Sequence, residues 1–136
     1  MARNVLVYAG FLVALLSRRD SHHAWAATHA PRFAPPWRTC AAVLSEAFHL
    51  LGTRGSPGLS ALLRRRALRV AFDLDTDVES VLKLLQKYAD VPMSLADACL
   101  VRMTETFPAP VILTTDADFR IYRRHSRQVV PCVLPS

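Results

Sequence analysis

Short apolar runs alternate along this chain with longer segments whose apolar residues recur at helical spacing. The short runs are rich in β-branched residues, and they predict strands at residues 5–7, 68–72, 111–114 and 129–133. The longer segments predict helices at residues 10–19, 20–30, 40–51, 59–66, 76–88 and 94–107, with a polar turn or short helix at 116–124. This alternation predicts an α/β fold, a three-layer α/β/α sandwich with a small parallel sheet whose last strand lies at an edge.

Helix-capping residues, prolines and glycines indicate where the helices are expected to begin and end. Residues 31–38, which include a proline pair, are expected to be a connection, Gly52 is expected to end a helix, and residues 55–58 are expected to form a turn. The spacings from Thr76 to Glu79 and from Ser94 to Asp97 fit capping boxes that open helices.

The composition fits one globular domain spanning residues 1–136, with 51% hydrophobic and 21% charged residues. The formal charge of +6 favours a polyanionic partner such as nucleic acid, although a solvated basic face explains it equally well. Three scattered cysteines indicate reduced thiols, a cytoplasmic protein and no zinc site. The apolar run at residues 5–16 is too short to span a bilayer, and the charged block at 18–23 argues against a secretory signal.

Three carboxylates have surroundings that ordinary surface exposure does not explain. Glu46 and Asp97 lie within apolar helical segments, and Asp116 follows a buried strand. Such groups are costly to bury alone but stable around a divalent cation. A simpler explanation exists for Asp97 and for Asp118, because each lies three residues after a Ser or Thr in capping-box spacing.

The order of these acids resembles a known family. Four stretches carry the resemblance: residues 5–15 (VLVYAGFLVAL), 43–46 (VLSE), 92–98 (PMSLADA) and 113–120 (LTTDADFR). Together they look like a PIN domain of the VapC type. The resemblance spans nearly the whole length, and its most specific part is the last stretch. It implies a metal-dependent endoribonuclease using Mg²⁺ or Mn²⁺, an RNA substrate, a homodimer, and a protein that is often the toxin of a toxin–antitoxin pair.

The resemblance also implies residue roles. Carried over position by position, Glu46, Asp97 and Asp116 would be metal-site acids, Asp118 would be an accessory acid, and Thr114 would orient Asp116. Clustered carboxylates of this kind hold cations that activate water for attack on phosphate.

Position 8 departs from the family pattern, which has an aspartate after the first strand where this chain has Tyr8. A neutral phenol does not replace a carboxylate as a ligand for a hard cation, so the catalytic position is predicted to be inactivated. Two explanations remain open: an inactivating Asp-to-Tyr change in a nuclease toxic to its expression host, or a natural, catalytically silent PIN-like module that binds RNA or protein.

Two further signals have alternative explanations. Arg120, Arg123 and Arg124 follow the acidic turn and are predicted to bind the RNA backbone, with a solvated face as the equally weighted alternative. The Asp73-Leu74-Asp75 segment resembles the nucleophile loop of haloacid-dehalogenase-like phosphatases, but a strand end followed by a capped helix explains it better.

Overall fold

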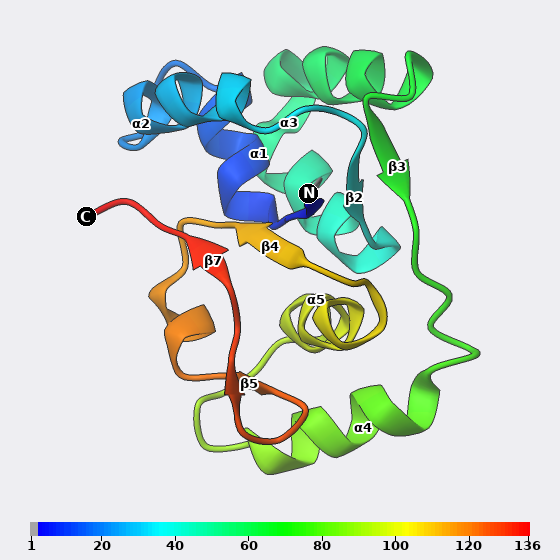
Figure 1. Cartoon of the computed structure of the whole chain (residues 1–136). Helices are drawn as coiled ribbons and strands as arrows, with labels where there is room; N and C mark the ends of the chain where they lie inside the picture. The colour runs from blue at the N-terminus through cyan, green and yellow to red at the C-terminus, as the bar shows by residue number, and fades with distance from the viewer. Residues whose placement is uncertain (1–2) are drawn as a thin grey trace.

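A parallel sheet of five short strands runs through the centre of the molecule, in the order β3-β2-β1-β4-β7 (Figure 1). The computed structural model describes residues 3–136. The strands are β1 (Asn4–Val7), β2 (Trp37–Thr39), β3 (Leu68–Val70), β4 (Pro110–Leu113) and β7 (Cys132–Val133). The chain moves from β1 outward to β3 and then returns to place β4 on the other side of β1, so the order reverses between β1 and β4.

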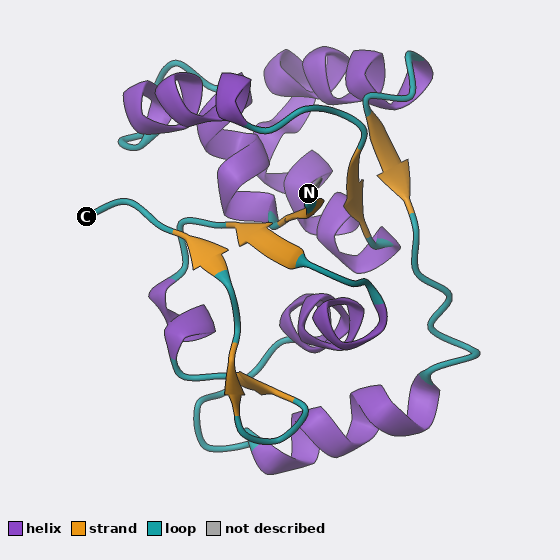
Figure 2. Cartoon of the chain, in the orientation of Figure 1, coloured by secondary structure: helices purple, strands orange, loops and turns teal. Residues whose placement is uncertain are grey.

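Helices cover both faces of this sheet, as Figures 1 and 2 show. On one side lie α1 (Ala9–Leu16), α2 (His23–His29) and much of α3 (Ala41–Arg64), and on the other lie α4 (Val78–Lys87) and α5 (Leu95–Thr106). Two short 3₁₀ helices, η1 (Ala30–Arg32) and η2 (Ala117–Arg120), and an antiparallel pair, β5 (Arg123–Arg124) with β6 (Gln128–Val129), complete the structure. The predicted α/β/α sandwich with a parallel sheet is confirmed.

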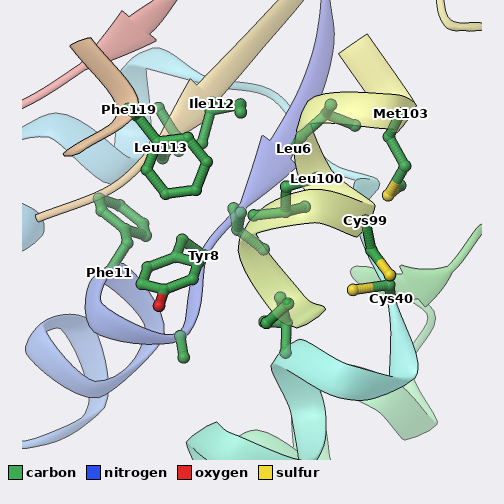
Figure 3. Packing of buried hydrophobic residues seen from close by; sticks show 14 of the residues in the cluster. Leu6, Tyr8, Phe11, Cys40, Cys99, Leu100, Met103, Ile112, Leu113 and Phe119 are labelled. Carbon is green, nitrogen blue, oxygen red and sulfur yellow. The ribbon is translucent and has the colours of Figure 1, made fainter. Parts of the chain in front are cut away.

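The sheet is apolar because helices bury both of its faces. Leu6, Ile112 and Leu113 have no solvent exposure, and Leu100 of α5 is equally buried beneath them (Figure 3). Phe11 of α1 packs edge-on against Trp25 and Trp37 on the opposite side, with ring centroids 5.7 Å apart in both pairs. The strands predicted at residues 5–7 and 111–114 therefore form the central pair, β1 and β4.

One strand of the sheet differs from the prediction. β2 lies within and just after the segment predicted to be a connection, yet it is an interior strand between β1 and β3. Its local sequence, Trp-Arg-Thr after two prolines, carries no strand pattern. Tertiary contacts hold it instead: β2 pairs with β1 and β3, and the Thr39 hydroxyl donates to the Val7 carbonyl at 2.9 Å.

The region around Gly52 agrees with the prediction in part. Gly52 has a non-helical φ of 63° and interrupts the helix as predicted, but the segment 55–58 that was predicted to be a turn is helical and belongs to the second half of α3. Ser56 donates its hydroxyl to the Gly52 carbonyl, so this carbonyl at the kink is hydrogen-bonded. Residues 55–58, although typical of turns, are thus part of the kinked helix α3.

Of the two predicted capping boxes, one is confirmed and one is wrong. Ser94 and Asp97 form a capping box at the start of α5. At α4 the N-cap is Asp77, without a side-chain cap, because the Thr76 hydroxyl donates instead to Asp73 at 2.8 Å. Asp73 therefore belongs to a local exposed turn, which agrees with the structural explanation of that segment rather than with a phosphatase loop.

Within residues 3–136, every helix is either too short or too polar to cross a membrane.

Candidate functional site

The predicted site residues at the ends of β1 and β4 lie on neighbouring strands. Val7 pairs with Leu113, and Tyr8 donates its backbone N–H to the Leu113 carbonyl at 3.0 Å. Tyr8 is also the N-cap residue of α1. In parallel α/β sheets, ligands bind beside the carboxyl ends of strands where the strand order reverses, and this point lies between β1 and β4.

The turn after β4 fixes the position of Asp116. The Thr114 hydroxyl accepts the backbone N–H of Asp116 at 3.0 Å, and Asp116 in turn accepts the backbone N–H of Asp118 at 2.9 Å, so that Asp116 caps η2. Thr114 thus contacts the backbone of Asp116 rather than its carboxylate. Because the N-cap of η2 is Asp116 and not Thr115, the alternative capping role of Asp118 is wrong.

The same turn is packed closely against the first turn of α1. A Cβ atom added at Gly10 would clash with the Thr115 hydroxyl oxygen. Only glycine leaves room for this approach, which brings α1 and Tyr8 against the Asp116 loop.

Asp97 occupies the first turn of α5 and is only 3% exposed. Its backbone N–H donates to the Ser94 hydroxyl at 3.0 Å, and its Oδ2 accepts the Tyr122 hydroxyl at 2.7 Å. Its Oδ1 is buried and, among the described residues, has no hydrogen-bond partner. Asp97 therefore caps the N-terminus of α5, and its Oδ1 is left without a hydrogen-bond partner among the described residues.

The negative charge of Asp97 contributes to raised pKa values of both Glu46 and Asp116. The pKa of Glu46 is raised, first by burial and then by the charges of Asp97 and Asp116. The pKa of Asp116 is raised mainly by burial, with the charges of Asp118 and Asp97 adding to the effect and the hydrogen bond from the Asp118 backbone opposing it. The three acids come from α3, α5 and the loop after β4, and the fold leaves them near enough for the charge of Asp97 to act on the other two.

Tyr8 lies among these acids. Its ring packs edge-on against Phe119 with centroids 5.2 Å apart, and only 8% of the residue is exposed (Figure 3). Burial raises the pKa of its phenol well above the ordinary value, and the negative charges of Asp97 and Glu46 raise it further. Tyr8 therefore stays neutral and supplies no charge to hold a cation.

The donor chemistry of the site suits a hard cation, but the arrangement does not. Carboxylate oxygens are the ligands that Mg²⁺ prefers, and the unpaired Oδ1 of Asp97 is such a donor. Within residues 3–136, however, no three His, Cys, Asp or Glu side chains are grouped closely enough to hold a metal ion. With Tyr8 among the acids, the site as it stands does not fit Mg²⁺ or Mn²⁺.

The predicted RNA-binding arginines have different environments. Arg123 donates to the carbonyls of Arg120, Ile121 and Tyr122 at 2.7, 3.2 and 3.0 Å. Arg124 donates to the Thr104 carbonyl and, at 3.1 Å, to Gln128. Both guanidinium groups thus hold the fold together, whereas the Arg120 side chain is exposed at the end of η2.

Tyr122 is a site residue that the sequence reasoning missed. Its ring is fully buried between Tyr88 and Phe119, and its hydroxyl holds Asp97. Asp97 is 25 positions away in the sequence, so no local pattern connects the two residues. An aromatic residue with a hydroxyl group soon after an acidic turn was the only available signal.

We expect Tyr122→Phe to lower the free energy of unfolding by about 1–3 kcal/mol, because it removes the shorter of the two hydrogen bonds to the buried Oδ2 of Asp97 and leaves only the Ser94 backbone N–H at 3.4 Å. Urea unfolding followed by circular dichroism measures the change. In an Asp97→Ala background the same substitution should cost much less, and equal costs in both backgrounds would mean that the hydrogen bond contributes nothing.

Comparison with solved structures identifies the fold. No family model matches the chain, and no curated protein sequence matches it. Among solved structures, the chain is similar to VapC20 of Mycobacterium tuberculosis, which is described as a toxin that cleaves the sarcin–ricin loop. The two structures superimpose with a TM-score of 0.72 and 23% sequence identity. The superposition covers 85% of this chain and 92% of VapC20. A protein of Pyrobaculum aerophilum superimposes with a TM-score of 0.50 and 23% identity, covering 87% of this chain and 84% of that one. The chain therefore has the PIN-domain fold of VapC, as the sequence resemblance predicted.

Proposed function

We propose that this chain carries the site of a PIN-type endoribonuclease in a form that Tyr8 keeps inactive. The observation that carries the proposal is that Glu46 and Asp116, on two separate elements, each have a pKa raised in part by the charge of Asp97 on a third element. Acids clustered at the carboxyl ends of parallel strands, with one buried oxygen atom unpaired, are the arrangement that divalent-cation nucleases use. The likeness of the fold to a toxin that cleaves an RNA loop supports the same class of reaction.

Each residue has a proposed role. Glu46, Asp97 and Asp116 are the metal-site acids, Asp118 is an accessory acid, and Thr114 positions Asp116 through its backbone. In this fold Mg²⁺ or Mn²⁺ supplies charge neutralisation and an acidified water at the phosphate. Because Tyr8 prevents a complete cation site, we assign no cleavage step to the present chain. Its RNA substrate, an antitoxin partner and a homodimeric state belong to the same proposal.

The test is RNA cleavage by this chain and by Tyr8→Asp, each with Mg²⁺, with Mn²⁺ and with a chelator. Metal-dependent cleavage by the aspartate variant alone supports the proposal. An aspartate variant that folds but binds no metal and cuts no RNA rejects it.

A second candidate is a catalytically silent module that binds RNA. The neutral Tyr8 side chain among the acids and the absence of a metal-binding group within residues 3–136 favour it. This candidate predicts that the chain binds RNA and that Tyr8→Asp gains no nuclease activity, so the same assay separates the two.

For both candidates, Arg120 is the arginine free to reach a phosphate, since Arg123 and Arg124 hold backbone carbonyls. We expect Arg120→Ala to weaken single-stranded RNA binding and to reduce the slope of log affinity against log salt by about 0.7. Fluorescence anisotropy across a salt series measures both. Arg19→Ala, an exposed arginine beyond the far end of α1, is the matched control, and equal effects of the two would indicate a diffuse basic surface.

A further inference from the structure

Two of the three cysteines meet in the core, at the point where α3 begins against α5. Cys40 is the N-cap residue of α3, and Cys99 lies in the first half of α5. Their sulfur atoms lie side by side in Figure 3, and each thiol affects the pKa of the other. Both are reduced and buried, with 1% and 2% exposure.

The surroundings of Cys40 favour its thiolate. Contact with the Cys99 thiol lowers the pKa of Cys40, burial opposes this, and the backbone amides of Val43 and Ala42 at the start of α3 lower it further. Thiols at helix N-termini are the more nucleophilic kind. The position of Cys40 at the N-terminus of α3 selects it as the attacking sulfur, and the neighbouring Cys99 sulfur is the partner.

We propose that Cys40 and Cys99 are an oxidation site that a hydroperoxide converts into an intramolecular disulfide. The Cys40 thiolate attacks the peroxide, which breaks the O–O bond, forms a sulfenic acid and releases an alcohol or water. The Cys99 sulfur then attacks the Cys40 sulfur, and the sulfenic oxygen leaves as water with the Cys99 proton. Overall, two thiols lose two electrons and two protons, and the peroxide is reduced.

The oxidant reaches this pair through local opening at the end of a helix. Ala41, the residue that follows Cys40, is exposed at the first turn of α3, whereas Cys40 itself is buried, so an oxidant reaches Cys40 only when this turn opens. Terminal turns open more readily than helix centres. Oxidation is therefore expected to be slower than that of an exposed thiol but to end in a cross-link rather than in overoxidation, because the second thiol is already in contact.

The disulfide would join the two helices that carry Glu46 and Asp97 and would close a chain loop of about 60 residues, a length for which the gain in stability is large. Its formation does not depend on the proposed nuclease activity, and its test uses neither RNA nor a metal ion.

The experiment treats the whole protein with hydrogen peroxide, blocks the remaining thiols with an alkylating agent, and maps peptides by mass spectrometry without reduction. The expected result is a Cys40–Cys99 peptide pair, one remaining alkylated thiol at Cys132, and a rise in the thermal midpoint of about 5 °C or more that a reductant reverses. Cys132→Ala is the matched control and should behave as the parent does.

Cys40→Ser keeps a favourable N-cap residue for α3, so this variant should fold and show no cross-link and no rise in midpoint. Cys99→Ala provides the second such variant. Recovery of three alkylated thiols after oxidation, sulfinic acid at Cys40 without a cross-link, or disulfides that form only through Cys132 between molecules would each overturn the proposal.

Discussion

Tyr8→Asp is expected to raise divalent-metal-dependent RNA cleavage by about 100-fold or more above that of the present chain. The substitution adds a fourth carboxylate beside Glu46, Asp97 and Asp116 and removes the phenol that lies among them. It should be tolerated locally, since position 8 is the N-cap of α1 and aspartate is a favoured N-cap residue at the positive end of the helix dipole.

A second measurement separates metal binding from catalysis. Four neighbouring acids repel one another, so Tyr8→Asp should have a lower thermal midpoint than the parent in a chelator and should recover with Mn²⁺. The parent should show no such dependence on Mn²⁺.

Controls for the gain of activity use the same background. Tyr8→Asp combined with Asp116→Asn should lose the cleavage, and Tyr8→Phe should stay as inactive as the parent. Cleavage that persists in a chelator, or that survives the loss of Asp116, would assign the activity to a contaminant or to another site.

Phe119→Ala is expected to lower the free energy of unfolding by about 3–5 kcal/mol. This ring is fully buried and packs edge-on against both Tyr8 and Tyr122, at 5.2 and 5.4 Å. Its removal leaves a cavity between η2, which carries Phe119, and the rings of Tyr8 and Tyr122. The loss is a large share of the total stability of about 5–15 kcal/mol typical of such domains.

Urea unfolding followed by fluorescence or circular dichroism measures this loss. Ile121→Ala is the matched control, because Ile121 is 52% exposed in the same segment and its truncation should change stability by less than about 0.5 kcal/mol. A loss at Phe119 as small as that at Ile121 would mean that the ring does not hold the site in place.

Local patterns were sufficient for the strongly apolar elements. The strands β1 and β4 were predicted because strands buried on both faces are continuous apolar runs. The capping box of α5 was predicted because its two residues lie at a fixed spacing in the sequence. The candidate acids were also recognised from residue type and surroundings, and their roles remain a prediction. The single last strand predicted at residues 129–133 is divided between β6 and β7, and β5 lies in the segment predicted as a turn or short helix, because two-residue strands carry no periodicity.

The failures share one physical cause, which is that long-range contacts outweighed local preference. β2 follows a proline pair and shows no alternation, but the hydrogen bonds offered by β1 and β3 make it an interior strand. The turn-forming residues after Gly52 continue a helix because α3 bends there and packs on α1. The RNA-binding role of Arg123 and Arg124 remains a prediction, although backbone carbonyls of the folded chain also accept hydrogen bonds from both guanidinium groups.

Residue type and short-range order were enough to predict the class of fold, the strand that precedes Asp116 and the presence of Tyr8 at the position of the expected acid. The folded chain was needed to show that the charge of Asp97 acts on Glu46 and Asp116, that Tyr122 donates a hydrogen bond to Asp97, and that Cys40 lies beside Cys99. Those contacts join residues that are distant in the chain, and the folded backbone alone brings them within the few ångströms over which hydrogen bonds and charges act.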